Sequence, residues 1–380
     1  MIMKNKIKNF SKEPVDFVLL VIVFIMLALG IVMVMSASAP TSLSKTGNSY
    51  RYVKTQAFSA CLGIIAMLVI SHIDYRIYKK FDWTIYIVVL ILLASVAVIG
   101  TEDGGAKRWI DLGFINFQPS EIAKIGLIIF YASLLTKNKD KIGEMKGGFF
   151  YPLLWLLPVI AILVGIQNHL SATLLIIMIV SIMMLMAGSK LKYFLTFGTA
   201  GAAAGAGVLY AVAKITGKGK FRLRRLVSFL DPFADIKGDG WQVVQSLYAI
   251  GSGGLFGVGL GNSTQKYAYI PEAHNDFIFS IIAEELGFLG CAVVITLFAL
   301  FIWRGIIIAM KAPDMFGSLI ALGITSMVGL QAIINIAVVT SSMPNTGMPL
   351  PFFSYGGTAL LILLASVGVL LNISRASKAK

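Results

Sequence analysis

The stretch YIPEAHNDFIFSIIAEELGFLGCAVVITLFALFIW, residues 269–303, decides the fold of this chain. Its second half, residues 286–303, is an uninterrupted run of apolar and small side chains. A helix needs about 18–20 such residues to cross the ~30 Å hydrocarbon core of a bilayer. Its first half contains Glu272, Asp276, Glu284 and Glu285, four of the 18 acidic residues of the chain. The stretch therefore joins a membrane span to a segment rich in acids.

The composition of the whole chain indicates the same class. Of its 380 residues, 57% are hydrophobic and 13% are charged, whereas about 25% of the residues of a soluble domain are charged. We therefore predict an all-α polytopic membrane protein, folded as a single membrane domain over residues 1–380. Basic residues in cytoplasmic loops explain the net charge of +14, so we expect no nucleic-acid partner.

Ten apolar runs are long enough to predict ten membrane-spanning helices. They fall near residues 16–36, 55–72, 82–100, 119–136, 150–167, 169–188, 191–213, 277–303, 316–340 and 354–373. The fifth and sixth runs are separated only by Gln167, Asn168 and His169, whose polar side chains fit a tight turn at the interface.

The distribution of Lys and Arg predicts the orientation of these helices. With the N-terminus in the cytoplasm, the short inner segments carry eighteen Lys and Arg residues and the short outer segments carry five. This asymmetry favours an even number of spans with both ends inside. The long loop near residues 214–276 then lies outside, and its glycine-rich middle is too broken for a span and resembles a re-entrant segment.

The outer loop contains a basic run. It consists of Lys214, Lys218, Lys220, Arg222, Arg224 and Arg225. One interpretation is a solvated face attracted to lipid headgroups. The other is a diphosphate-binding site, because the forked donors of arginine match phosphate oxygens.

Asp276 is the first candidate for chemistry, since the predicted topology puts it at the outer interface after Glu272 and His274. Ionisable groups at such depth are functional when they line a cavity. The alternative is an acid in the first turn of a helix, stabilised by the helix dipole. Glu284 and Glu285 lie deeper, and we expect them to form a supporting layer that needs a basic or hydrogen-bonding partner.

A second candidate stretch is AKRWIDLGFINFQPSEIAKIG, residues 106–126. Lys124 lies inside a predicted span and needs a carboxylate partner, for which Glu121 at i,i+3 spacing and Asp276 are both candidates. The pair Glu121–Lys124 is either catalytic or a local helix-stabilising pair. Trp109 suits the headgroup region, and Arg108 suits an anionic headgroup.

A third stretch, SSMPNTGMPLPFFSYGGTALLI, covers residues 341–362. Three prolines and three glycines in this short outer loop predict a rigid turn. Asn345, Thr346, Ser354 and Tyr355 supply polar groups that can contact a lipid headgroup, and the alternative is a purely structural loop. The sequence contains no P-loop, HExxH or CxxC motif, which argues against an ATP-driven or zinc-dependent mechanism.

Together these stretches resemble the SEDS family of shape, elongation, division and sporulation proteins, with its FtsW, RodA and SpoVE branches. The resemblance covers nearly the whole chain and rests on SAS at 36–38, KRWIDLGFINFQPSEIAK, PEAHNDFIFSIIAEELG and TGMPLPFFSYGGTAL. INIAVVTSSMPNTGMPLPFFSYGG is closer to the FtsW and SpoVE branch than to RodA. One departure is His169, where many members read QPDLGT with an acid, so the role of that acid is not transferred.

The resemblance implies a ten-span peptidoglycan glycosyltransferase of the bacterial cytoplasmic membrane, at the division or spore septum. Such an enzyme polymerises lipid II into glycan strands on the outer face, with a class B penicillin-binding protein as transpeptidase and other division or sporulation proteins as partners. The family's catalytic aspartate falls on Asp276, and its intramembrane Glu and Lys fall on Glu121 and Lys124. No cofactor is implied, and a divalent cation, Mg²⁺ or Mn²⁺, on the substrate diphosphate remains an alternative.

This resemblance leads to a mechanistic hypothesis. Asp276 takes the proton of the acceptor 4-hydroxyl while Lys124 orients Asp276 and keeps it ionised. The leaving undecaprenyl diphosphate is held by Arg108, Arg222, Arg224 and Arg225. Two other classes remain open: a lipid II flippase, which needs a polar path across the bilayer, and a non-catalytic scaffold of a division complex.

Overall fold

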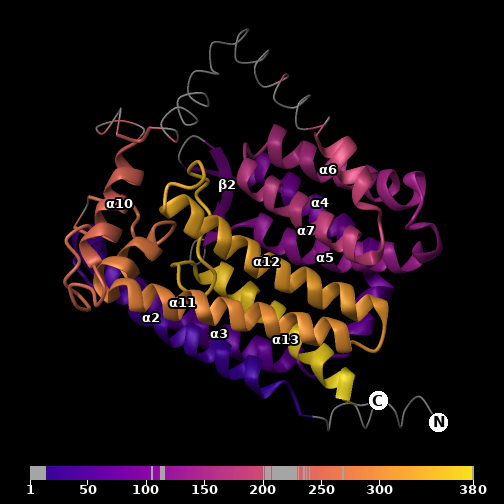
Figure 1. Cartoon of the computed structure of the whole chain (residues 1–380), viewed down its shortest axis with the longest axis horizontal. Helices are drawn as coiled ribbons and strands as arrows, with labels where there is room; N and C mark the ends of the chain where they lie inside the picture. The colour runs from indigo at the N-terminus through magenta and orange to yellow at the C-terminus, as the bar shows by residue number, and fades with distance from the viewer. Residues whose placement is uncertain are drawn as a thin grey trace.

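The computed structural model describes residues 14–103, 106–111, 116–199, 240–267 and 269–378, with isolated positions at 201, 207, 229, 231–233, 236 and 238. In the described residues the chain is a bundle of long helices (Figure 1). Nine of these helices are long and apolar enough to cross a membrane. The expected span 191–213 is described as helix over 191–199, and the basic run from Lys214 to Arg225 lies outside the described residues.

The helices agree with the predicted spans in order and differ from them at their ends. Their bounds are α2 (Phe17–Thr46), α3 (Arg51–Ile70), η1 (Tyr75–Phe81), α4 (Asp82–Ile99), α5 (Pro119–Lys137), η2 (Lys139–Lys141), η3 (Met145–Phe150), α6 (Tyr151–Gly165), α7 (Leu170–Ala187), α10 (Trp241–Gly253), α11 (Ile278–Lys311), α12 (Met315–Val339) and α13 (Gly357–Lys378). The α2 helix continues ten residues beyond its predicted end and stops at Gly47, whose left-handed φ of 68° suits glycine. The middle of the loop expected outside forms α10, which with 13 residues is too short to span a bilayer.

A small sheet interrupts the helical pattern between α4 and α5, and the all-α prediction did not include it. Its antiparallel strands are β1 (Thr101–Asp103), β2 (Ala106–Asp111) and β3 (Asn116–Phe117). Thr101 pairs with Trp109, and Ile110 pairs with Phe117. The strands are too short and too polar to produce a recognisable period in the sequence. The sheet holds Arg108 and Trp109 on a strand just before α5.

The α12 helix lies at the centre of the bundle, where it packs against α5, α7, α11 and α13. Figure 1 shows α10 at one end of the bundle and the start of α2 at the other. At that second end the backbone N–H of Asp16 donates to Ser374 Oγ over 3.0 Å. The Arg304 guanidinium lies 2.7 Å from the Asp16 carboxylate. The start of α2 therefore lies beside the end of α13.

The α11 helix is broken at Gly287, which adopts φ 67° and ψ −165°. Residues 254–261 fill the break, because the N–H groups of Val258 and Gly259 donate to the carbonyls of Glu284 and Glu285 over 2.9 and 3.1 Å. A Cβ atom at Gly287 would lie 2.3 Å from the backbone nitrogen of Gly257. The loop after α10 therefore replaces helical hydrogen bonds that α11 gives up.

Side chains of Glu284 and Glu285 hold the same loop. Glu284 accepts hydrogen bonds from the Thr264 N–H over 2.9 Å and from the Ser263 hydroxyl over 2.5 Å. Glu285 lies 2.8 Å from Lys266 Nζ, and both side chains are buried. Ser36 of α2 completes this group, because its hydroxyl donates to Glu285 over 2.7 Å. The partners that these two acids need thus come from the outer loop and from α2.

Replacing Gly287 by alanine is expected to destabilise the protein by roughly 1–3 kcal/mol, because its φ/ψ region is open almost only to glycine. Thermal unfolding in detergent measures the effect. Gly251→Ala is the control, since Gly251 is helical and no atom lies within 4 Å of its Cβ position. A stable Gly287→Ala variant would contradict the role of the break.

The buried pair Lys266–Glu285 is expected to respond asymmetrically to substitution. Lys266→Met alone leaves a buried carboxylate unpaired and costs about 3–5 kcal/mol, whereas Lys266→Met with Glu285→Gln costs less. The exposed pair Lys45–Glu272 is the control, where Lys45→Met costs about 1 kcal/mol or less. Equal losses in the single and double variants would contradict the pairing.

Candidate functional site

Asp276 lies in the turn before α11, which begins at Ile278 without a side-chain cap. It belongs neither to the first turn nor to the cap, contrary to the dipole-stabilised alternative. The side chain is half-buried, and its carboxylate has no hydrogen-bonding partner among the described residues. Burial raises the pKa of the Asp276 carboxyl to about 6, and the negative charge of Glu272 adds to the rise.

Charged and aromatic side chains surround this turn. Glu272 lies between Lys45, whose Nζ is 2.9 Å from Oε1, and His274, whose Nε2 is 3.3 Å from Oε2. His274 is 1% exposed and packs against the rings of Tyr52 and Tyr355, with centroids 4.9 and 5.6 Å away. Burial lowers the pKa of the His274 imidazole. His274 is therefore neutral and forms part of the packed lining of the site.

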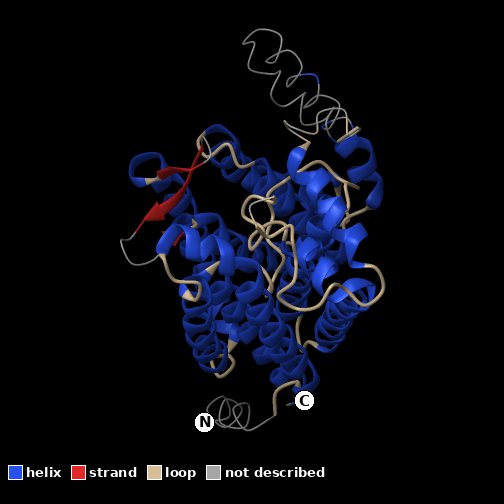
Figure 2. Ribbon diagram, turned by 90° about the vertical axis from the view of Figure 1, so that its left-hand side faces the viewer, coloured by secondary structure: helices blue, strands red, loops and turns tan. Residues whose placement is uncertain are grey.

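The loop 341–356 covers the turn and is bonded to it along its backbone. The Ser354 hydroxyl donates to the Asn275 carbonyl over 2.7 Å, and the Tyr355 N–H donates to the His274 carbonyl over 2.9 Å. Ser354 Oγ also accepts a hydrogen bond from the Leu350 N–H over 2.7 Å, so this hydroxyl stabilises the loop and joins it to the turn. Figure 2 shows loop segments in the middle of the surrounding helices.

Two buried amides in spans support this arrangement, and sequence reasoning missed both. Gln56 of α3 donates to the Ser354 carbonyl over 3.1 Å. Asn335 of α12 donates to the carbonyls of Asp276 and Met348, both over 2.7 Å. The only signal in the sequence is a polar side chain inside an apolar run, which does not identify its partners.

The tip of the same loop lies against Asp276 and bridges two helices. A Cβ atom on Gly347 would lie 3.2 Å from Asp276 Oδ2. The neighbouring Thr346 carbonyl accepts a hydrogen bond from Ser171 at the start of α7. Asn345 Nδ2 donates to Gln242 Oε1 of α10 over 3.0 Å. The loop therefore connects the carboxylate with α7 on one side and α10 on the other.

A cationic group lies around the start of α7. Arg108 Nη2 donates to the Asn168 carbonyl over 2.9 Å, which places β2 beside the turn between α6 and α7. Burial, helped by the charges of Arg108 and Lys124, lowers the pKa of His169 to about 3. His169 is thus neutral beside two cations, where the related motif has an acid.

Lys124 is 4% exposed and pairs with Glu121 over 2.9 Å, which is the first of the two partners expected for it. No hydrogen bond or ion pair joins Lys124 to Asp276 in the described part of the chain. Ser171, two residues after His169, donates to the Thr346 carbonyl, so the start of α7 contacts the loop that lies against Asp276.

The remaining candidates fall outside this centre. Trp109 is half-buried on β2 and pairs with Thr101. Arg222, Arg224 and Arg225 lie outside the described residues. Within the described ranges, no group of three or more His, Cys, Asp or Glu side chains is arranged to hold a metal ion.

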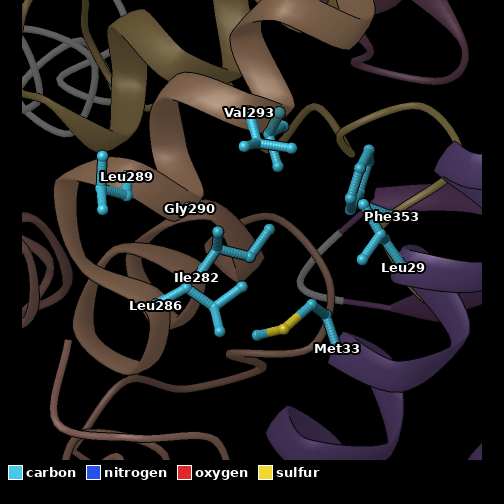
Figure 3. A pocket seen from close by; sticks show the side chains of 9 residues that line it. Leu29, Met33, Ile282, Leu286, Leu289, Gly290, Val293 and Phe353 are labelled. Carbon is cyan, nitrogen blue, oxygen red and sulfur yellow. The ribbon is translucent and has the colours of Figure 1, made fainter. Parts of the chain in front are cut away.

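An apolar cavity of about 270 Å³ lies between α2 and the broken part of α11 (Figure 3). Leu29 and Met33 line it from α2, Ile282 and Leu286 from α11, and Phe353 from the covering loop. Its lining suits hydrocarbon and contributes nothing to acid–base chemistry.

Comparison with known proteins agrees with this geometry. The sequence profile of the cell cycle protein family FtsW/RodA/SpoVE matches residues 17–379. The chain is 42% identical over 364 residues to "Probable peptidoglycan glycosyltransferase FtsW" of Geobacter sp. (strain M18), covering 95% of this chain and 97% of the relative. It is 38% identical over 370 residues to "Stage V sporulation protein E" of Bacillus subtilis (strain 168), covering 97% and 99%.

Solved structures share the fold. A structure titled "Structural coordination of polymerization and crosslinking by a peptidoglycan synthase complex" matches with a TM-score of 0.78 and 30% identity over 95% of this chain and 98% of that chain. The rod shape determining protein RodA of Thermus thermophilus matches with a TM-score of 0.69 and 28% identity, over 95% and 97%. The resemblance inferred from the motifs is confirmed: this multi-pass bacterial membrane protein belongs to the FtsW/RodA/SpoVE family of cell cycle proteins.

Proposed function

We propose that this protein is a peptidoglycan glycosyltransferase that polymerises lipid II on the outer face of the cytoplasmic membrane. The observation that carries the proposal is the half-buried carboxylate of Asp276, which has no hydrogen-bonding partner among the described residues and lies against Gly347 of the covering loop. The relatives named as glycosyltransferase and sporulation protein support the reaction class and a role in division or spore formation.

In the proposed reaction, Asp276 is the general base. The acceptor 4-hydroxyl oxygen attacks the anomeric carbon of the donor while its proton passes to the Asp276 carboxylate. The new glycosidic bond forms as the bond from the anomeric carbon to the diphosphate oxygen breaks, and the electron pair leaves with the diphosphate. A base opposite the leaving group inverts the configuration.

The leaving group needs positive charge on the other side of the reacting carbon. Arg108 and Lys124 are suited to that position, because fixed cations stabilise a departing diphosphate without reorganisation. We assign Lys124 to this side rather than to Asp276, since its ion pair is with Glu121. Glu121 then positions the ammonium group.

Partners and a cation complete the proposal. A class B penicillin-binding protein at the division or spore septum would supply transpeptidation, supported by the neighbouring structure of a peptidoglycan synthase complex. Mg²⁺ or Mn²⁺, where required, would arrive with the substrate diphosphate.

Asp276→Asn is expected to lower polymerisation by about 10²–10⁴-fold, the usual contribution of a general base. Purified protein is reconstituted with lipid II, with and without a cognate penicillin-binding protein, and polymer length is read on a gel. Glu144→Gln, an exposed acid in the connection between α5 and α6, is the control. Full polymerisation by Asp276→Asn would overturn the assignment, and lipid II translocation without polymer would favour a flippase.

The rate is expected to rise with pH through a midpoint near 6, because only the ionised Asp276 accepts a proton and its pKa is raised to about 6. Glu272→Gln removes the negative charge that contributes to this rise, so the midpoint moves to lower pH. Single-turnover rates between pH 4.5 and 8 measure both profiles. An unchanged midpoint in Glu272→Gln would contradict this coupling.

Asp276 is also expected to reduce stability at neutral pH. Its folded-state pKa of about 6 exceeds the ordinary 3.8, so the folded state binds more protons and loses stability as pH rises between these values. Asp276→Asn should therefore raise the free energy of unfolding at pH 7 by up to about 3 kcal/mol and change it little at pH 4. Thermal unfolding at both pH values measures the change in stability. An Asp276→Asn variant that is less stable than the wild type at pH 7 would contradict this prediction.

A further inference from the structure

Asn335 holds two separate backbone segments with one amide. It lies near the outer end of α12, and its side chain is 1% exposed. Its Nδ2 donates over 2.7 Å to the carbonyl of Asp276 and over 2.7 Å to the carbonyl of Met348. One of these carbonyls belongs to the turn that presents the carboxylate, and the other belongs to the loop that covers it.

The orientation of this amide is fixed by its partners. Both partners are carbonyl oxygens, which accept and cannot donate, so only the NH₂ group can face them. Asn335 Oδ1 is buried and has no partner in the described part of the chain. The two carbonyls are therefore the side chain's whole set of hydrogen bonds there.

The two hydrogen bonds of Asn335 lie next to the carboxylate of Asp276. Gly347 precedes Met348, has a left-handed φ of 65°, and approaches Asp276 Oδ2 so closely that a Cβ would lie 3.2 Å away. The amide that fixes the peptide of Asp276 thus also fixes the loop segment against the Asp276 side chain.

We propose that Asn335 is a positioning residue of glycosyl transfer. It holds the Asp276 turn and the 347–348 segment in a fixed position relative to each other.

This inference rests on the proposed role of Asp276 as the base. Glu272 is the charged group that acts on Asp276, and Lys45 and His274 lie against Glu272, whereas Asn335 adds no charge to them. Its loss therefore changes the place and exposure of the carboxylate rather than the charges near it.

Asn335→Leu is the test variant, because leucine has a similar size and no hydrogen-bond donor. The expected result is a fall in kcat of about 10²-fold, the effect of a misplacement near 1 Å, with KM changed less than about threefold. The acid midpoint of the pH–rate profile should fall below its wild-type value near 6, because the released carboxyl becomes more exposed to water.

Asn372→Leu is the matched control. Asn372 is 0% exposed on α13, donates to the Ser71 carbonyl over 2.9 Å and accepts from the Tyr75 N–H over 3.0 Å. It is a buried amide joining backbone segments at the opposite end of the bundle. We expect Asn372→Leu to lower the unfolding temperature but to leave the pH midpoint unchanged.

A second readout does not depend on activity. In a background with Cys61→Ala and Cys291→Ala, the thiol introduced by Asp276→Cys is labelled with a membrane-impermeant maleimide. Adding Asn335→Leu should speed labelling about tenfold, through more frequent local opening of the turn. Adding Asn372→Leu should not.

The outcomes separate the two proposals. Wild-type kcat, midpoint and labelling in Asn335→Leu would overturn the positioning role while Asp276→Asn, if inactive, still supports the base. Full activity of Asp276→Asn would overturn both. A midpoint shift or faster labelling in Asn372→Leu as well would assign the effect to general destabilisation and overturn the positioning role.

Discussion

Backbone that leaves helical geometry within a membrane protein must find its hydrogen bonds inside the protein, since lipid offers none. The turn around Asp276 and the loop 341–356 meet this constraint through buried polar side chains of Asn335, Gln56 and Ser354. Their positions place the carboxylate at the mouth of the bundle. The site is therefore a consequence of how non-helical backbone is satisfied between α3, α11 and α12.

The break in α11 follows the same rule on a larger scale. Gly287 ends one helical segment, and the loop after α10 donates its N–H groups to the carbonyls that are released there. Glu285, Lys266 and Ser36 then tie this loop to α2 through buried, charge-assisted hydrogen bonds. The loop after α10 is thus anchored to two membrane-spanning helices, α2 and α11.

Hydropathy was enough to predict the helical membrane class, and the motif around Asp276 pointed to this acid as the candidate base. Contacts between distant segments were not predictable. Lys266 carried no sign that it would pair with Glu285, and an isolated glycine at 287 looked like any other in an apolar run. Asn335 is one amide in a span, and only the folded chain brings two carbonyls within 2.7 Å of it. The short strands near Trp109 lacked a usable period.

The connection between Asn335 and loop 341–356 also has a consequence for biosynthesis. The ribosome makes Ser36 and Gln56 early, Asp276 late, and the covering loop almost last. Because that loop supplies the carbonyl of Met348 and the backbone of Gly347 beside the carboxylate, a chain halted after α12 carries Asp276 without its enclosure. The surroundings of Asp276 are thus complete only after the loop that precedes α13 has been made.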